Sequence, residues 1–317
     1  MQRILPAILL FLMNCTSTTP STGTIASADG VSIWYRTAGS GPPLVIVHGG
    51  PGMDHGSLAA DLVPLSKTHR LIFYDQRGGG RSTLPDDPKL LAIEHSVADL
   101  EALRLHFGFD RMTLVAHSFG PAVAALYALE HPDRVERMVF LGPIPPAKTT
   151  FFEDYGAALS ARLTPGNLKR LDELNASFAS SPDPVAVCRE YWKIATPPRV
   201  AKSISVSVVK SDLCAGPAEA IRFGMTKTNP ATFGSLGDWD WRERLHALAT
   251  PTLVIHGEED AIPMALVRDW SLAMPDARLM RLAETGHFPH AERPGVVLPA
   301  IEQFLGGSWP SQAIKEH

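Results

Sequence analysis

The sequence has few cysteines, little imbalance of charge and no long apolar run, and each absence excludes a class of protein. It holds three cysteines, and no Cys/His cluster has the spacing of a zinc site. The 29 Lys and Arg against 33 Asp and Glu give a net charge of −4, so nothing electrostatic favours nucleic acid as a partner. No P-loop is present, and the sequence implies no metal, nucleotide or flavin cofactor. A polytopic membrane protein, a collagen, a coiled coil and a disordered tail are all excluded.

What is present is typical of a large globular protein. Apolar residues make up 45% and charged residues 20% of the 317 residues, which are ordinary values for a folded chain. A chain of this length forms about two domains, or one domain with a large insertion. The 27 prolines are many, and they indicate long, shaped loops.

The first 24 residues have the pattern of an export signal and its tether. Arg3 precedes an apolar run at 4–13, which is about half the length needed to span a bilayer and suits a secretory signal. Cys15 and a Ser/Thr-rich stretch follow, as in a bacterial lipoprotein signal whose cysteine is lipidated. We therefore expect a periplasmic protein or a lipoprotein anchored to a membrane through Cys15, with secretion as the alternative. A frayed apolar start that packs on the core, or a mis-assigned start codon, is the other interpretation.

Short apolar runs alternate with helical patterns over the first 145 residues. The predicted strands are 31–36, 44–47, 70–74, 112–116 and 135–141, and the predicted helices are 96–107 and 119–130. Continuous apolar runs are expected of strands that are covered on both faces, and Gly108 is a plausible stop for the first helix. The repetition predicts an α/β fold, with a mostly parallel sheet and helices on both faces.

The alternation stops between about residues 143 and 246 and then resumes. The interrupting stretch has helical segments and polar loops but no clear strand pattern. Beyond it we predict strands at 252–256 and 278–282 and helices near 265–273 and 296–304. A sheet that is interrupted and then completed predicts one core domain, residues 25–145 and 247–317, with an inserted helical cap at 146–246.

The strongest local motif is Ala116-His117-Ser118-Phe119-Gly120, between a predicted strand and a predicted helix. A Ser on such a tight turn has a strained backbone that projects its hydroxyl. Small residues are needed two positions before and after it, because the strand and the helix pass close together; Ala116 stands where Gly is usual. The motif predicts Ser118 as a nucleophile, and a purely structural turn is the alternative.

A serine hydroxyl needs a base to remove its proton, and histidine is the natural base at neutral pH. Among 12 histidines, His287 stands just after the last predicted strand, where parallel sheets place their sites; His290 is its rival. Asp260 follows the preceding strand and gives the chain order Ser, Asp, His of such sites. Glu258 and Glu259 compete with Asp260, unless all three acids form a solvated loop.

A glycine-rich turn, His-Gly-Gly-Pro-Gly at 48–52, follows a predicted buried strand. Glycines let a backbone approach a substrate closely, so we expect Gly49 to contact the substrate. The charge that develops on an attacked carbonyl needs N–H donors fixed in advance. We expect the N–H groups of Gly50 and Phe119 to form this oxyanion hole.

Two of the three cysteines fall in the predicted cap. Cys188 and Cys214 are 26 positions apart, and such a pair in an oxidising compartment can form a disulfide. Closing a loop of that size stabilises a protein by about 3 kcal/mol. We predict a structural disulfide, with two buried thiols as the alternative.

These segments occur in an order that resembles the proline iminopeptidase family of α/β-hydrolases. The turn at 48–52 comes first, then Tyr-Asp-Gln-Arg-Gly-Gly-Gly-Arg-Ser at 74–82, then the Ser118 turn and the Asp260 and His287 segments. The resemblance covers most of the core. It implies the α/β-hydrolase fold and removal of an N-terminal residue, often Pro, from short peptides. Taken alone, the segment 74–82 is a turn stabilised by an ion pair between its Asp75 and a nearby Arg.

The resemblance also implies carboxylates in the cap that hold the free amino group of the substrate, because a buried ammonium without a partner is costly. In close relatives a Glu follows a Trp in a Trp-rich helix. Here Trp192 precedes Lys193, so we expect Trp192 to contact the substrate and Glu190 to replace the missing acid. Asp212 and Asp240 are the other candidates, and an exposed acid on a cap helix is the plain interpretation of each.

The sequence therefore predicts a serine hydrolase in which Ser118 forms an acyl-enzyme, His287 acts as base and then acid, and Asp260 orients it. The substrate is a small peptide by resemblance, and a carboxylesterase or lactonase that acts on a small ester is the alternative. Epoxide hydrolases and dehalogenases need a carboxylate nucleophile, which a Ser at position 118 excludes. A binding protein built on an inactive hydrolase is disfavoured, because all three members of the triad are present.

Overall fold

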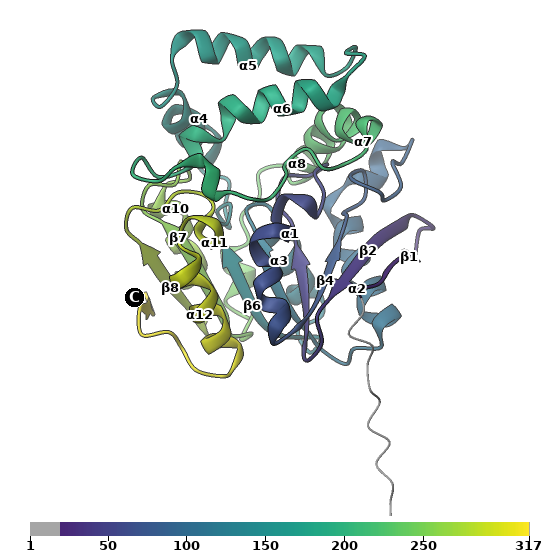
Figure 1. Ribbon diagram of the computed structural model, residues 1–317. Coiled ribbons are helices and arrows are strands. Elements are labelled where there is room, and N and C mark those ends of the chain that lie inside the picture. The colour runs from purple at the N-terminus through teal and green to yellow at the C-terminus, as the bar shows by residue number, and fades with distance from the viewer. Residues whose placement is uncertain (1–19, 317) are drawn as a thin grey trace, which may run out of the picture.

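The computed structural model describes residues 20–316, and a nine-stranded sheet runs through its core (Figure 1). The strands lie in the order β1-β2-β4-β3-β5-β6-β7-β8-β9. Neighbouring strands from β4 to β8 are parallel, whereas β1, β2 and β9 run antiparallel to their neighbours. The strands are β1 (Thr22–Ala26), β2 (Ser32–Ala38), β3 (Pro43–Val47), β4 (Arg70–Tyr74), β5 (Met112–His117), β6 (Val135–Leu141), β7 (Thr252–Gly257), β8 (Ala277–Leu282) and β9 (Ala313–Ile314).

The central strands are apolar along their whole length because both faces of the sheet are covered. One face packs against α2 (Ile93–Phe107), α3 (Gly120–Glu130) and α10 (Met264–Ala273). The other face packs against α1 (Gly56–Leu62) and α12 (Pro294–Leu305). The short helices η1 (Val63–Lys67), η2 (Pro88–Leu91) and α11 (Pro289–Glu292) lie in the connections. The predicted α/β class with a mostly parallel sheet is confirmed.

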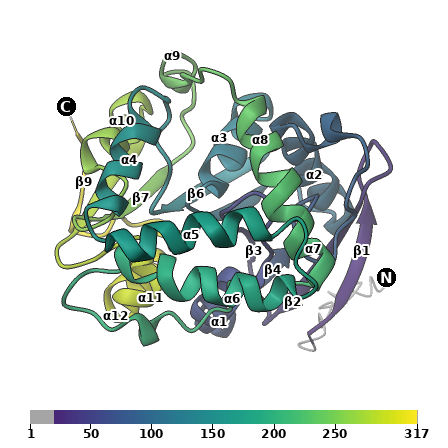
Figure 2. The same ribbon diagram turned by 90° about the horizontal axis from the view of Figure 1, so that it is seen from above.

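A helical cap is inserted between β6 and β7 and lies above one edge of the sheet (Figures 1 and 2). The two ends of the insertion meet where Ala147 and Asp240 form an isolated antiparallel bridge. Helices α5 and α6 run side by side across the top of Figure 1 and across the middle of Figure 2. The cap contains α4 (Phe151–Ser160), α5 (Pro165–Ser177), α6 (Pro184–Ala195), η3 (Pro197–Arg199), η4 (Val206–Val208), α7 (Ala218–Phe223), η5 (Gly224–Thr228), α8 (Asn229–Ser235) and α9 (Arg242–Leu245).

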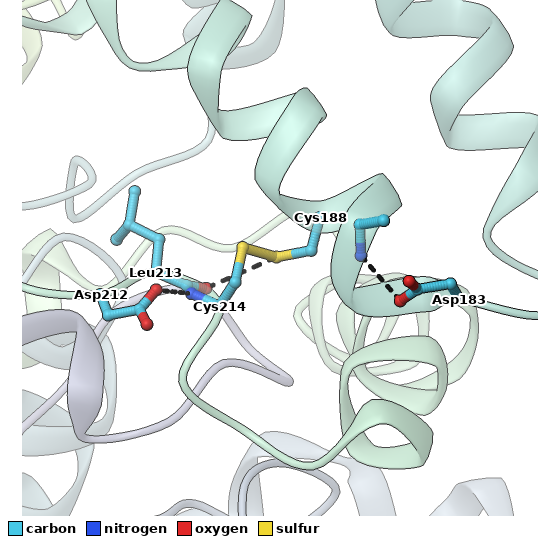
Figure 3. Close-up of a disulfide and its surroundings, with 6 residues drawn as sticks. Asp183, Cys188, Asp212, Leu213 and Cys214 are labelled. Atoms are coloured by element: carbon cyan, nitrogen blue, oxygen red, sulfur yellow. Dashed lines mark hydrogen bonds between the residues drawn. A yellow bond between two sulfur atoms is a disulfide. The ribbon is translucent and has the colours of Figure 1, made fainter.

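Cys188 and Cys214 form the disulfide expected from the sequence. Figure 3 shows that it joins helix α6 to the loop that precedes α7. On that loop the backbone N–H of Cys214 donates to Asp212 Oδ1 at 2.9 Å. The bridge therefore connects two parts of the cap that have no other covalent link nearby.

Several elements differ from the sequence prediction. Helix α2 begins three residues earlier, at Ile93, and it ends as predicted before Gly108, whose φ of 67° closes the helix. Residues 22–24, which we assigned to the N-terminal tether, belong to strand β1. The expected signal segment and Cys15 lie outside the described residues. Within residues 20–316, no helix is long and apolar enough to cross a membrane.

Candidate active site

Ser118 occupies the turn between β5 and α3, at the carboxyl end of a central strand. Its φ of 58° is unusual for a residue with a side chain, and this strain is what projects the hydroxyl from the turn. The close approach that the motif requires is visible at Gly120, where a Cβ atom would lie 2.4 Å from the carbonyl oxygen of Val47. Any larger residue there would push the helix away from the sheet.

The three predicted catalytic side chains form one hydrogen-bonded chain. His287 Nε2 lies 3.0 Å from Ser118 Oγ, and His287 Nδ1 lies 2.8 Å from Asp260 Oδ2. The other oxygen of Asp260 accepts from the N–H of Ile262 at 3.0 Å. Burial by itself would raise the pKa of Asp260, but the neighbouring His287 and His256 hold that pKa below its ordinary value. Asp260 is therefore ionised and fixes the proton of His287 on Nδ1, which leaves Nε2 free to accept the serine proton.

The rivals that the sequence left open lie elsewhere. His290 packs edge-on against His117, with ring centroids 5.0 Å apart, and within residues 20–316 its ring nitrogens have no hydrogen-bond partner. Glu258 is exposed, and Glu259 accepts from the backbone N–H of Lys202. In the part of the chain that the structure describes, the His287 side chain is hydrogen-bonded to Asp260 and Ser118 and to none of these three.

The glycine-rich turn after β3 brings backbone N–H groups to the nucleophile. A Cβ atom on Gly49 would lie 3.3 Å from Ser118 Oγ, so only glycine fits there. Gly50 has a φ of 61°, a conformation that glycine adopts without strain. Within residues 20–316, the N–H groups of Gly50 and Phe119 have no hydrogen-bond partner in the protein. Both residues line the cavity in front of Ser118, as an oxyanion hole requires.

The segment 74–82 holds the glycine-rich turn in place. The Gln76 side-chain amide donates to the carbonyl of His48 at 2.6 Å, and the backbone N–H of Gln76 donates to His48 Nε2 at 3.0 Å. Burial lowers the pKa of His48 to about 4, so its ring is neutral and can accept this bond. Gln76 thus positions the turn from behind, without touching the cavity.

The ion pair expected at Asp75 has a different partner. Asp75 Oδ1 accepts from His55 Nδ1 at 2.7 Å and from the His55 backbone N–H at 2.9 Å, and Oδ2 accepts from the backbone N–H of Arg81. The Arg77 guanidinium, from the same segment, is paired with Asp99 and with Asp29 instead. The predicted Asp–Arg pair is therefore wrong, although the structural role of the segment holds.

The group Asp54, His55 and Asp75 is the one place among the described residues where three buried metal-ligating side chains converge. The Asp75 oxygens and His55 Nδ1 are already bonded to one another and to the backbone. Burial and the nearby Asp75 raise the pKa of Asp54 to about 6, and Asp54 Oδ1 accepts from the backbone N–H of Gly56 at 2.7 Å. These hydrogen bonds give the cluster a structural role.

A cavity of about 390 Å³ opens in front of Ser118, between the core and the cap. Its walls are mostly apolar and aromatic, and the predicted contact residue Trp192 is one of them. No Asp or Glu lies among the described residues that line it. The one Arg or Lys on its walls is Arg199, from the end of η3. No local pattern in the sequence singles out this residue, because its role depends on how the cap folds back over the core.

The acids proposed to bind an amino group do not reach this cavity. Glu190 is exposed and is paired with Arg170 on the outer side of the cap, at 2.7 Å. Asp212 accepts from the backbone beside the disulfide, and Asp240 pairs with Arg242. The expectation that Glu190 contacts the substrate is wrong, because an exposed partner on a neighbouring helix satisfies its charge outside the site.

Comparison with known proteins agrees with this architecture. Residues 42–294 match the family model described as alpha/beta hydrolase fold. Proline iminopeptidase of Lactobacillus helveticus is 26% identical over 87% of this chain and 95% of that protein. The 2-hydroxymuconate semialdehyde hydrolase of Pseudomonas putida is 29% identical over 92% and 97%. The crystal structure of proline iminopeptidase from Mycobacterium smegmatis shares the fold, with a TM-score of 0.66 at 22% identity over 90% and 98%.

The resemblance to proline iminopeptidases is thus confirmed, as a similarity that spans most of the chain. The matched family segment contains the strained serine, the glycine-rich turn, Asp260 and His287, together with the whole cap. This protein therefore belongs to the alpha/beta hydrolase fold family.

Proposed function

We propose that the protein is a serine hydrolase that cleaves small esters bearing a carboxylate group. The observation that carries this proposal is the cavity in front of Ser118, whose described walls hold an arginine and no acid. A substrate with a free ammonium group would find no counter-charge there, whereas a carboxylate would find Arg199.

The reaction follows from the geometry of the site. Ser118 Oγ attacks the ester carbonyl as its proton passes to His287 Nε2, and the N–H groups of Gly50 and Phe119 receive the negative charge of the carbonyl oxygen. The C–O bond then breaks, and His287 returns the proton to the departing alcohol. Water attacks the acyl-enzyme by the same route in reverse, which releases the acid and restores Ser118.

Arg199 is fixed at the cavity wall with part of its guanidinium unused. Its Nε donates to Tyr155 Oη at 2.9 Å and its Nη1 donates to the carbonyl of Ala195. The guanidinium carbon lies 5.6 Å from the Tyr155 ring centre and 5.5 Å from that of Trp192. Within residues 20–316, Nη2 has no hydrogen-bond partner and Arg199 has no ion-pair partner. A held guanidinium with a free edge is well suited to bind a carboxylate.

Of the relatives, one supports a carboxylate-bearing substrate, and others favour a second candidate function, an aminopeptidase. The name of the Pseudomonas putida relative describes hydrolysis of a substrate that is itself a carboxylate. The proline iminopeptidases among the relatives favour release of an N-terminal residue from a peptide. That activity needs a partner for the substrate ammonium, and Glu190 does not provide one inside the cavity.

The test compares esters that carry a carboxylate group with neutral esters of similar shape. For the acyl side we would use 4-nitrophenyl hemisuccinate against 4-nitrophenyl pentanoate, and for the alcohol side 4-acetoxybenzoate against phenyl acetate. Ser118→Ala should abolish hydrolysis of all four. Arg199→Gln should raise KM for at least one of the charged esters more than tenfold, since a charge-assisted hydrogen bond contributes about 1.5–3 kcal/mol, and should leave the neutral esters within about threefold.

Arg189→Gln is the matched control, because Arg189 is an exposed arginine on the neighbouring cap helix. It should change neither class of ester. Faster turnover of a Pro-anilide than of any ester would replace this proposal with the aminopeptidase. Ester hydrolysis that survives Ser118→Ala would overturn the mechanism itself.

A further inference from the structure

Glu292 is a buried carboxylate next to the candidate base that the reaction itself does not use. It lies at the end of α11, five residues beyond His287, and its exposed fraction is 6%. Within residues 20–316, no cation pairs with it. Its oxygens instead accept from backbone N–H groups: Oε2 from Gly286 at 2.8 Å and from Ala201 at 2.9 Å, and Oε1 from Phe288 at 2.9 Å.

The backbone N–H groups of residues 286–288, the stretch that carries the base, all have hydrogen-bond partners. Gly286 and Phe288, on either side of His287, both donate to Glu292. The N–H of His287 itself donates to the carbonyl of Arg199 at 2.7 Å. The carbonyl of His287 accepts from His117 Nε2 at 2.9 Å. Hydrogen bonds therefore fix the backbone of the base at three successive residues, 286 to 288.

Two of these contacts come from the cap. Arg199 ends η3 and Ala201 follows it. The carbonyl of Arg199 accepts from the N–H of His287, and the N–H of Ala201 donates to Glu292. The approach is close, since a Cβ atom on Gly286 would lie 2.2 Å from the Arg199 carbonyl oxygen. Glu292 thus bonds at once to the loop of the base and to the cap.

We propose that Glu292 is a positioning residue for His287, which it ties to the segment 199–201 of the cap. This inference rests on the proposed function, because it assigns Glu292 a role in moving the serine proton. A misplacement of about 1 Å at a reacting group can cost about 100-fold in rate. The 3.0 Å separation of His287 Nε2 from Ser118 Oγ leaves little margin for such a shift. In a Gln at this position, one acceptor oxygen is replaced by an NH₂ group that faces backbone donors.

The decisive experiment uses Glu292→Gln, with Glu302→Gln as control. Glu302 is an exposed glutamate of helix α12 that meets only the Thr68 hydroxyl. Each variant is assayed on a 4-nitrophenyl ester and on the ethyl ester of the same acid, and active sites are counted by titration with diethyl 4-nitrophenyl phosphate. Nitrophenolate leaves without a proton, whereas ethoxide must take one from His287.

We expect Glu292→Gln to lower kcat per titrated site on both esters, since His287 must take the serine proton in both. The loss should be largest on the ethyl ester, about 100-fold, because its leaving group also needs a proton from His287, and KM should stay within about threefold. Glu302→Gln should match the wild type. A wild-type kcat per site, or an equal loss on both esters with a lowered melting temperature, would overturn the inference and leave a structural role only.

A second variant covers the case in which Glu292→Gln does not fold. Glu292→Asp keeps the charge but is one methylene shorter, so it cannot reach all three donors, and it should show the same dependence on the leaving group at a smaller magnitude. Equal rates for Glu292→Asp and the wild type would also overturn the inference. Failure of the proposed function has separate signatures, because a Pro-anilide would then be turned over faster than any ester, or hydrolysis would survive Ser118→Ala.

Discussion

Several positions around Ser118 must be glycine, because their neighbours lie too close for any side chain. Gly142 follows β6 with a φ of 52°, and a Cβ atom there would lie 3.3 Å from His287 Nδ1 and 3.4 Å from Asp260 Oδ2. A side chain at this position would press on the hydrogen bond that orients the base. Gly142 is therefore required for the same reason as Gly49 and Gly120, the close packing around the catalytic side chains, although it lies apart from both in the sequence.

The buried His290 behind the site lowers the stability of the folded protein, and a mutation can test this. His290 is 1% exposed, and neither of its ring nitrogens has a hydrogen-bond partner. Burial lowers its pKa to about 4 from 6.5, although the charge of Asp61 partly opposes the shift. The unfolded chain therefore binds a proton at this position below pH 6.5 that the folded protein binds only near pH 4. The free energy of unfolding must decrease as the pH falls through this window.

We predict that His290→Leu stabilises the protein and reduces its sensitivity to acid. At pH 7 the free energy of unfolding should rise by about 1 kcal/mol, because an unsatisfied buried polar group is removed. Between pH 6.5 and 4 the variant should lose about 3 kcal/mol less than the wild type. Urea denaturation at pH 7 and at pH 4.5 measures both effects. His246→Leu, which replaces an exposed histidine, is the control, and equal acid sensitivity in both variants would contradict the argument.

The sequence could predict those site residues that lie within a local motif and could not predict those that depend on a distant segment. Ser118 and Gly50 stand in short patterns whose backbone geometry is largely local. Asp260 and His287 follow from their place after successive strands. Arg199 and Glu292 act through contacts between the cap and the core, and nothing next to them in the chain signals this. Glu190 failed as a prediction for the same reason, since its partner Arg170 comes from another helix.

At the level of elements, the prediction succeeded where burial is complete. Strands β3, β4 and β5 are continuous apolar runs, and all three were expected within one or two residues of their observed limits. Strand β1 was missed because only Ile25 among its five residues is buried, so the sequence shows no alternation. Helix α1 was missed because it has seven residues and no side-chain cap. Such elements form through pairing and packing with neighbours rather than through their own pattern.

The disulfide links two elements that build the cavity, and its removal should affect substrate binding. Trp192 lies one turn after Cys188 on α6, Leu213 precedes Cys214, and both Trp192 and Leu213 line the cavity. We predict that Cys188→Ala with Cys214→Ala lowers the free energy of unfolding by about 3 kcal/mol. KM for the esters should rise severalfold while kcat stays within about threefold, since the triad lies on the core.

Thermal unfolding and steady-state kinetics with and without a reducing agent provide the measurement. The reduced wild type should resemble the double variant, and the double variant itself should not respond to the reducing agent. An unchanged KM in both would show that the walls of the cavity hold their places without the bridge.

For the whole molecule, the sheet and the cap explain why residues far apart in the chain meet. Strands β3, β5, β7 and β8 are parallel, so the loops that follow them emerge at one edge of the sheet. Those loops carry the glycine-rich turn, Ser118, Asp260 and His287. The cap covers these loops (Figure 1), and the cavity in front of Ser118 lies between the loops and the cap.

The disulfide also bears on where the protein works. Disulfides persist in oxidising compartments, and the bridge in the cap therefore supports the proposal that the chain is exported through its N-terminal signal.

We predict that the full-length chain, expressed in a Gram-negative bacterium, is recovered in the membrane fraction and takes up radiolabelled palmitate. Cys15→Ser should prevent both, while ester hydrolysis stays at the wild-type level, because Ser118, Asp260 and His287 are all held by elements that follow β1 in the chain. Cys188→Ala serves as the control for loss of a cysteine and should still be labelled. Full-length chain that stays unlabelled in the cytoplasm would contradict both export and lipidation, and unlabelled protein in the periplasm would contradict lipidation alone.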